Sequence, residues 1–248
     1  MTQTRTLGFL IALSLFPLFC SAESSTRILT SSSHEAPDFK SIKNVKQKKK
    51  AFFDYLEPFI VQANQAILEE RRFIKSLNFN KLSIYQRRQV EQLVEKYRLK
   101  YKEITPQTQS TLLKKIDIIP SSLALAQAAN ESSWGTSRFA TQANNYFGQW
   151  CFEKGCGMVP LRRPHGKYHE VKKFQSPLQS VKSYMLMLNN HPAFKPFRQL
   201  RLKARQQNKP VNGLALVDGL EPYSALKQEY VKIIASMIRV NKLTLLDS

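Results

Sequence analysis

Apolar residues recur at helical spacing in the first half of the chain. Residues 51–72 carry one apolar stripe, formed by Phe52, Leu56, Phe59, Ala63, Ile67 and Leu68. Ser83 can cap a second helix, and its inward positions are Val90, Leu93, Val94 and Tyr97. The pattern predicts a helical N-terminal region over residues 51–114. We interpret its stripes as a core or docking face, because no residue pattern there indicates chemistry.

Three further helices are predicted in residues 115–245. The first can be capped by Ser121 or Ser122, with Leu123, Ala126 and Ala129 facing inward. The second has a typical start at Ser176-Pro177 and ends at His191-Pro192. Its inward positions are Leu178, Val181, Met185 and Leu188. The last helix is predicted from about residue 224 to residue 240.

The intervening residues 141–170 show a different pattern. Five of the eight glycines lie between Gly135 and Gly166, accompanied by Pro160 and Pro164. Short runs such as Tyr168 to Phe174 alternate enough to form strands. We therefore expect an α+β, predominantly helical fold with a small inserted β-hairpin lobe, preceded by the N-terminal helical segment.

The start of the chain is typical of a secretory signal peptide, which we assign to residues 1–22. Arg5 is its only charge, residues 7–20 are apolar, and Cys20-Ser21-Ala22 resembles a cleavage site. The apolar run is short for a membrane span, so we favour export over an uncleaved anchor or a lipoprotein. Residues 23–50, rich in Ser and then Lys, are expected to form a disordered basic linker. The expected location is periplasmic or secreted.

The net charge of +20 implies an anionic partner. Nine basic residues and no acid lie between Glu170 and Asp218: Lys172, Lys173, Lys182, Lys195, Arg198, Arg201, Lys203, Arg205 and Lys209. Export argues against nucleic acid. Carboxylate-bearing polymers outside the cytoplasm and an anionic membrane surface are the candidate partners. The alternative is a solvated basic face without a specific partner.

Cys151 and Cys156 are the only cysteines that remain once the signal peptide is removed. An isolated close pair in an oxidising compartment favours a disulfide, and Gly155 and Gly157 allow the tight turn. A zinc site with His165 and His169 is the alternative, but the spacing fits no standard zinc pattern. We expect neither a metal nor a cofactor.

Glu131 is the first candidate for chemistry. It ends an apolar helical run, directly before an aromatic residue, Trp134, and Gly135. A half-buried carboxyl beside an aromatic ring is expected to have a raised pKa, as a general acid requires. The alternative is an ordinary surface glutamate. Residues 118–217 hold only two other carboxylates, Glu153 and Glu170, so any acid–base pair in that stretch must come from these three.

The segments 127–140 and 144–148 together resemble the core of the bacterial peptidoglycan glucosaminidases. That family includes the muramidase-like domain of the flagellar rod protein and many autolysins. Segments 174–181 and 220–225 follow in the family's order, so the resemblance covers roughly residues 115–245. It implies a lysozyme-like domain that cleaves the β-1,4 bond after N-acetylglucosamine in peptidoglycan. A lytic transglycosylase and a non-catalytic wall-binding protein are the alternatives.

Glycoside cleavage needs an acid for the leaving oxygen and a second group that stabilises or attacks the sugar centre. Glu131 is the expected acid. Glu170 follows 39 residues later, a separation similar to that of the carboxylate pair in the flagellar enzymes, so the resemblance favours it as base. A surface partner of Lys172 or Lys173 is its alternative role, and Glu153 is the fallback base. The substrate's acetamido group can also act as nucleophile, oriented by Tyr223, which matches the family's cleft tyrosine.

Aromatic rings that can stack on sugar faces are Trp134, Tyr146, Phe147, Trp150 and Tyr168. Core packing is the alternative for each of them, and for Phe147 it is the better interpretation. Asn144 and Asn145 are predicted either to hydrogen-bond an acetamido group or to make the turn.

Overall fold

The computed structural model describes residues 35–161, 163 and 165–247, so the expected signal peptide lies outside the described residues. The disorder expected up to residue 50 is wrong for residues 36–50. Phe39 is only 2% exposed and packs edge-on against Phe52 and Tyr55. Asn44 caps the first helix, and its side chain accepts a hydrogen bond from the amide of Gln47. The buried Phe39 ring and the Asn44 cap order this segment despite its lysine-rich composition.

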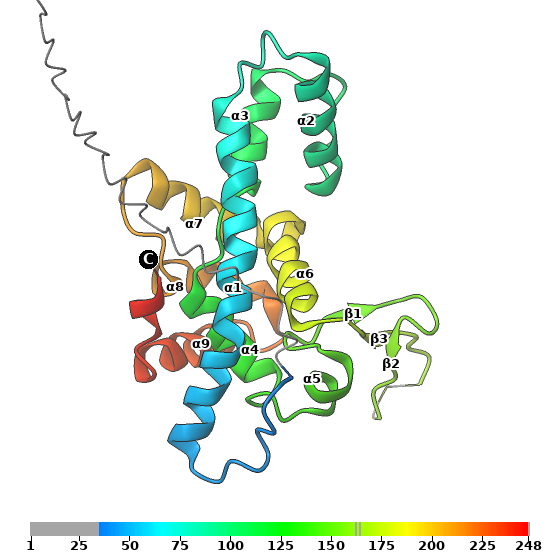
Figure 1. The fold of residues 1–248 in the computed structure, drawn as a ribbon, viewed down its shortest axis with the longest axis vertical. Coiled ribbons are helices and arrows are strands. Elements are labelled where there is room, and N and C mark those ends of the chain that lie inside the picture. The colour runs from blue at the N-terminus through cyan, green and yellow to red at the C-terminus, as the bar shows by residue number, and fades with distance from the viewer. Residues whose placement is uncertain (1–34, 162, 164, 248) are drawn as a thin grey trace, which may run out of the picture. The chain divides into compact units, whose positions relative to one another are not determined.

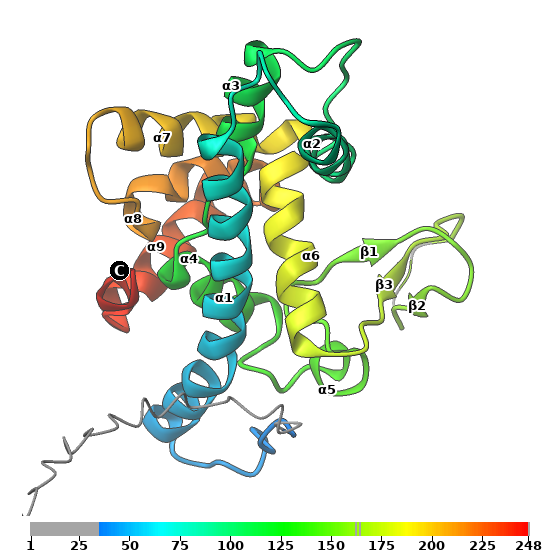
Figure 2. The same cartoon turned by 45° about the horizontal axis from the view of Figure 1, so that its top comes forward.

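Helix α1, Val45–Ser76, is longer at both ends than the expected residues 51–72. It packs against α3, α4 and α6, and Figures 1 and 2 show it running alongside α6. Helices α2, Ile84–Lys96, and α3, Pro106–Lys115, follow near its C-terminal end. The predicted cap at Ser83 is confirmed, with Gln86 completing a capping box. The N-terminal helices therefore share one hydrophobic core with the later helices.

Helix α4, Ser121–Glu131, is buried from Ser121 through Ala129. Neither Ser121 nor Ser122 caps it, because the helix already begins at Ser121 and Pro120 occupies the cap position. The backbone amide and hydroxyl of Ser122 instead donate to the Asp247 carboxylate near the C-terminus. Helix α5, Arg138–Ala143, follows after a tight turn.

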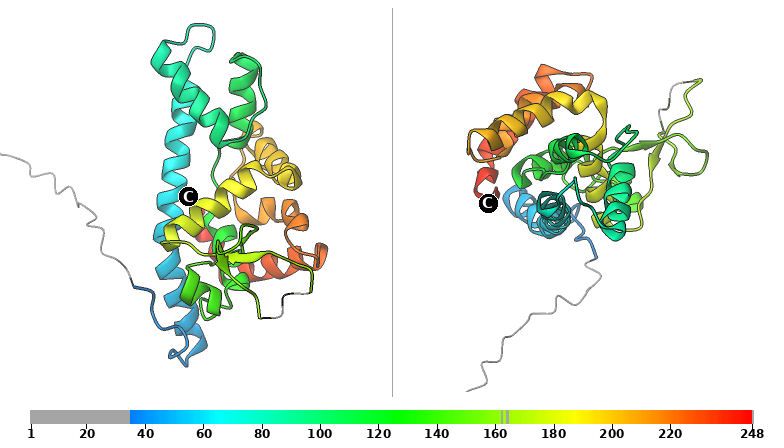
Figure 3. Two further views of the ribbon diagram at one scale, coloured as in Figure 1. Left: turned by 90° about the vertical axis from the view of Figure 1, so that its right-hand side faces the viewer. Right: turned by 90° about the horizontal axis from the view of Figure 1, so that it is seen from above.

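The glycine-rich segment forms three short strands rather than a simple hairpin. Strands β1, Trp150–Cys151, and β2, Gly157–Met158, both pair antiparallel with β3, Glu170–Lys172. The strand order is β1-β3-β2, and Figure 3 shows this lobe beside the helices. A β-carbon on Gly157 would lie 2.0 Å from the carbonyl oxygen of Val171, so only glycine fits there. The small β lobe within a mostly helical fold is confirmed.

The C-terminal part is helical. Helix α6, Pro177–Asn190, has the predicted Ser176 cap, and it ends before His191 as expected. The remaining elements are η1 Pro192–Phe194, α7 Lys195–Gln206, α8 Gly213–Leu216, η2 Val217–Tyr223, α9 Gln228–Val240 and η3 Leu243–Leu246. The last long helix starts at residue 228, later than predicted. Pro222 lies in the preceding 3-10 segment, and Lys227 has a positive φ of 46°.

Several arginines of the basic run are structural. Arg201 is 1% exposed and donates to the backbone carbonyls of Asp117 and Ile118. Arg205 pairs with the Asp117 carboxylate at 2.9 Å, and Arg71 of α1 lies 3.6 Å from it. Arg198 donates to the carbonyls of Leu188 and His191. The six lysines of the same run are exposed, as expected for a solvated face.

Asp117 therefore joins α1 and α7 through one buried carboxylate. Burial alone would raise its pKa. The hydrogen bond from Arg205 and the positive charges of Arg201 and Arg71 outweigh burial and lower the pKa. The carboxylate stays ionised and balances part of the surrounding positive charge.

Within the described residues, no helix is both long and apolar enough to cross a bilayer.

We predict that Asp117→Asn lowers the free energy of unfolding by about 3–5 kcal/mol, because it leaves buried arginines without their counter-charge. Urea unfolding followed by circular dichroism measures the loss. The matched control is Asp54→Asn, which breaks an exposed pair with Lys50 and should cost no more than about 1 kcal/mol. Equal effects of the two substitutions would contradict a special role for Asp117.

Candidate active site

Glu131 is the last residue of α4 and is half-buried. Its Oε1 accepts hydrogen bonds from the Tyr230 hydroxyl at 2.8 Å and the Asn130 side-chain amide at 3.1 Å. Its Oε2 lies 3.5 Å from the position that a β-carbon on Gly148 would take. The two carboxylate oxygens therefore differ. One is held by donors, and the other faces a residue without a side chain.

A chain of hydrogen bonds fixes this carboxylate from inside the core. The Tyr184 hydroxyl donates to Gln127 at 2.6 Å, and the Gln127 amide donates to the Tyr230 oxygen at 2.9 Å. Tyr230 then donates to Glu131. Burial raises the pKa of Tyr184 and Tyr230, and the charge of Glu131 adds to the effect. Both phenols therefore remain protonated donors at neutral pH.

Gln127, Tyr184 and Tyr230 are site residues that the sequence pattern did not predict. The available signal was a polar residue in an otherwise apolar helix, since Gln127 stands among Leu125, Ala126, Ala128 and Ala129. The two tyrosines occupy inward positions of α6 and α9, where an aromatic residue is typical of ordinary core packing.

Tyr223 joins the same cluster. Its ring stacks on Tyr230 with centroids 5.4 Å apart and planes 5° apart, and its hydroxyl donates to the carbonyl of Phe147 at 3.0 Å. Burial raises its pKa, with Tyr184 and Glu131 contributing. The structure thus brings Tyr223 next to the partner of Glu131. Its hydroxyl holds the loop that leads to Gly148.

Trp134 lies in the turn that follows Glu131 and packs against α1. Residues 133–135 all have positive φ, and this tight turn directs the indole toward α1. The ring packs edge-on against Phe53 at 5.4 Å and Phe52 at 5.9 Å, with the Lys49 ammonium 4.9 Å from its centroid. Trp134 therefore anchors the turn after Glu131 to α1, as the core-packing alternative expects, although the side chain is only half-buried.

The interpretation of Tyr146 as a sugar-stacking residue is wrong. It is 1% exposed and packs beside Phe52 and Tyr55 of α1. Phe147 is also buried and stacks on Tyr184 with centroids 3.9 Å apart, which confirms core packing for that ring. Both side chains are inside because the 144–148 loop is folded onto the helices on either side.

Asn144 and Asn145 make the turn. Asn144 ends α5 in a left-handed conformation and donates to the carbonyl of Phe174. Asn145 is 1% exposed, and its amide donates to the carbonyls of Gln149 and Lys172. Its side-chain oxygen accepts from the amides of Phe147 and Gln149. Asn145 is fully used in holding the loop beside Glu131, so an acetamido contact by Asn145 is not what the structure favours.

Two predicted stacking residues do lie on the surface of the β lobe. Trp150 is 57% exposed, and its ring is stacked on His169 with centroids 4.1 Å apart. Tyr168 is 79% exposed. Both rings remain available to a ligand.

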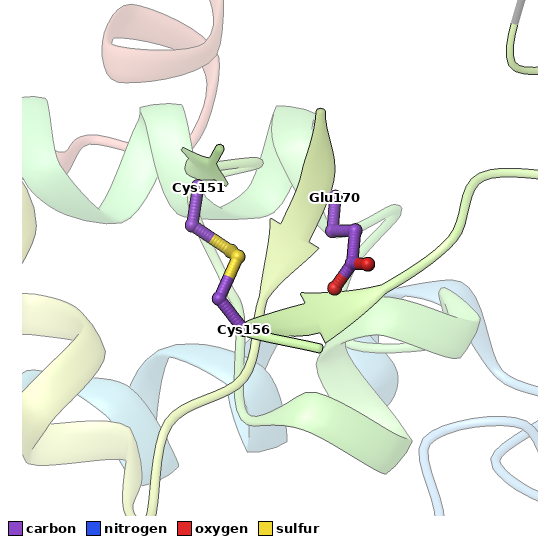
Figure 4. A group of neighbouring side chains, drawn as sticks. All are labelled: Cys151, Cys156 and Glu170. Carbon is purple, nitrogen blue, oxygen red and sulfur yellow. A yellow bond between two sulfur atoms is a disulfide. The ribbon is translucent and has the colours of Figure 1, made fainter. Parts of the chain in front are cut away.

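The predicted disulfide is present between Cys151 and Cys156, as Figure 4 shows, so these sulfurs are not free to bind zinc. Glu170 lies beside it, opposite Cys151 in the sheet. Its carboxylate accepts hydrogen bonds from the amides of Gly155 at 3.0 Å and Gly157 at 2.8 Å. These bonds lower its pKa, with Arg163 and Lys154 assisting. The carboxylate contacts backbone amides rather than Lys172 or Lys173, and it holds the disulfide loop against β3.

Glu153 lies within the disulfide loop and is exposed, and its carbonyl accepts from the amide of Cys156. That arrangement is typical of a turn residue. Neither Glu153 nor Glu170 is hydrogen-bonded to Glu131, whose side-chain partners are Tyr230 and Asn130.

Comparison with known proteins gives the family of this chain. The model of the glucosaminidase family, described as mannosyl-glycoprotein endo-beta-N-acetylglucosaminidase, matches residues 106–243. This chain belongs to the glucosaminidase family. It is also similar to protein bax of Escherichia coli strain K12, with 32% identity over 212 residues, which is 85% of this chain and 76% of that protein. No solved structure matches. The matched glucosaminidase segment begins at α3 and therefore leaves out α1 and α2.

We predict that Glu170 stabilises the β lobe at neutral pH and loses this effect in acid. Its folded pKa is lowered, so the stabilisation is complete above the unfolded value of about 4.3 and disappears as the pH falls through the folded pKa. Amide NMR shifts of Gly155 and Gly157 should report one titration with a midpoint below about 4.3. Glu170→Gln should remove that titration. A midpoint at or above the ordinary value would refute the two-amide clamp.

Proposed function

We propose that this glucosaminidase is an exported peptidoglycan hydrolase that cleaves the β-1,4 bond after N-acetylglucosamine. The observation that carries the proposal is the Glu131 carboxylate, with Oε1 held by two donors and Oε2 facing Gly148. Membership of the family supports a glycan substrate. The signal pattern in residues 1–22 supports a periplasmic or secreted location, where peptidoglycan is available.

Glu131 acts as the general acid. Its Oε1 already accepts hydrogen bonds from Tyr230 and Asn130, so a proton on the carboxyl belongs on Oε2. That oxygen is the one that faces Gly148, where no side chain blocks the approach of a glycosidic oxygen. Transfer of this proton to the leaving oxygen breaks the bond as positive charge builds on the sugar ring.

Glu170 is the proposed base, and it activates the attacking water. Its lowered pKa keeps it ionised at neutral pH, and two backbone donors fix its orientation. A carboxylate with a lowered pKa is a weak base, so position must contribute more than basicity. The rival mechanism uses the substrate's acetamido group as nucleophile, with Tyr223 orienting it from the cluster around Glu131.

The proposed partner is the peptidoglycan strand. Trp150 and Tyr168 offer exposed rings for sugar faces. The six exposed lysines of residues 172–209 supply positive charge for stem-peptide carboxylates or for an anionic membrane surface. Each such contact is weakened by salt.

We predict that Glu131→Gln abolishes cleavage while the fold is kept. The substitution is nearly isosteric and still accepts from Tyr230, but it removes the transferable proton, which contributes roughly 10²–10⁴-fold in rate. Mass analysis of peptidoglycan digested by purified protein measures the products. Reducing-end N-acetylglucosamine supports the hydrolase, whereas anhydro-muramic ends indicate a transglycosylase.

Glu153→Gln is the matched control, because Glu153 is an exposed carboxylate of the β lobe. It should cleave at the wild-type rate. Absence of any product from wild-type protein would support the wall-binding alternative. Wild-type turnover by a folded Glu131→Gln protein would remove Glu131 from the mechanism.

We predict that Glu170→Gln and Tyr223→Phe separate the two hydrolytic mechanisms. If Glu170 is the base, Glu170→Gln should slow turnover by about 10² or more with little change in binding, and added azide should restore part of the rate. If the acetamido group attacks, Tyr223→Phe should be the more damaging change. The β lobe must be intact in both variants, which circular dichroism and the amide signals of Trp150 and Met158, whose strands pair with β3, report.

A further inference from the structure

The side-chain amide of Gln149 has no hydrogen-bond partner among the residues that the structure describes. Both its nitrogen and its oxygen are buried. Elsewhere in the described chain, the other buried side-chain atom in this state is a single oxygen, on Asn190. A buried amide that forms no hydrogen bond is unfavourable, because it has lost its bonds to water without replacing them. Such groups in native proteins call for an explanation, and functional sites are a common one.

Gln149 lies in the loop that passes Glu131. The preceding residue, Gly148, is the one that faces Glu131 Oε2. The loop is held on both sides, because the Tyr223 hydroxyl binds the Phe147 carbonyl and Asn145 binds both the amide and the carbonyl of Gln149. The Gln149 carbonyl also accepts from the amide of Lys172 on β3. The backbone of Gln149 is therefore fixed next to the catalytic carboxylate.

The side chain has more freedom than its backbone. Gln149 as a residue is half-buried, although the amide at its tip is not accessible. Rotation about its side-chain bonds can therefore turn the amide outward without moving the loop. In its buried position the amide makes no hydrogen bond, so turning it toward a ligand that offers one donor and one acceptor breaks none.

We propose that Gln149 binds the acetamido group of the N-acetyl sugar next to the scissile bond. This inference rests on the proposed function. A carboxamide presents an acceptor oxygen and donor N–H groups in one plane. An acetamido group presents the complementary N–H and carbonyl, so two parallel hydrogen bonds can form. Gln149 is thus a specificity-determining residue that selects N-acetylated over free-amine sugars.

The test compares Gln149→Met and Gln149→Glu with wild type. Methionine keeps the length of the side chain and removes the polar atoms, and glutamate keeps the acceptor but loses the donor. With β-1,4 oligomers of N-acetylglucosamine, kcat/KM should fall about 10- to 100-fold for Gln149→Met and by less for Gln149→Glu. The preference for these oligomers over their partly de-N-acetylated forms should shrink in parallel.

Thermal unfolding provides a second readout that a purely structural role would not reproduce. Removal of an unpaired buried amide should raise the Tm of Gln149→Met, by an amount on the order of 2–4 °C, while activity falls. The matched control is Gln207→Met at an exposed position after α7, which should change neither. A Gln149→Met protein that keeps the wild-type preference for acetylated oligomers would overturn the proposal.

Calorimetric binding of the same oligomers distinguishes this proposal from the proposed function. If wild type binds acetylated oligomers without cleaving them, the hydrolase is wrong, and weaker binding by Gln149→Met still supports the role of Gln149. If wild type binds acetylated and de-N-acetylated oligomers equally, the role of Gln149 is wrong whether or not cleavage occurs.

Discussion

The burial of α4 is the constraint on which the rest of the structure depends. Nine consecutive residues, 121 to 129, are buried, so the helix must be covered on every side. Helix α1 covers it from one direction, and α8, α9 and η3 cover it from others. The first residues that reach solvent are Asn130 and Glu131 at its end. A helix that cannot carry charge along its length therefore presents its one carboxylate at a defined point of the surface. The small side chains of its Ala residues allow the neighbouring helices to approach closely, which fixes that point.

Polar side chains inside this core connect its helices to one another through hydrogen bonds. Gln127 is the one polar residue in the buried centre of α4, and it both accepts from Tyr184 and donates to Tyr230. Hydrogen bonds in such a low-dielectric setting are strong when all members are satisfied. This series of hydrogen bonds ends at Glu131, so α6 and α9 both determine the position of its carboxylate. Asp117, in the segment before α4, also connects helices, because its carboxylate pairs with Arg71 of α1 and Arg205 of α7.

Prediction from the sequence succeeded where local chemistry decides the outcome. The Ser83 and Ser176 caps, the β lobe, the disulfide and the α+β class all follow from residue types at short spacing. It failed where tertiary contacts decide. The residues next to Tyr146 and Trp134 do not indicate that α1 packs against these rings. The lysine-rich segment around Phe39 does not indicate that this ring is buried in the core. Arg201 belongs to the run of basic residues that was expected to form an exposed face, yet it is buried against Asp117. The Tyr230 contact joins residues 99 apart in the chain, which no window of sequence could show.

The position of α1 has a consequence for how the glucosaminidase part of the chain should be delimited. The segment that matches the family ends at residue 243 and begins only at residue 106. Yet Phe52 and Phe53 cover Trp134, and Phe52 and Tyr55 cover Tyr146. A polypeptide cut at residue 106 would expose these rings directly behind the turn that follows Glu131. The boundary of the family match is thus not a boundary of the folded core, and α1 belongs to the same compact unit as the helices that surround Glu131.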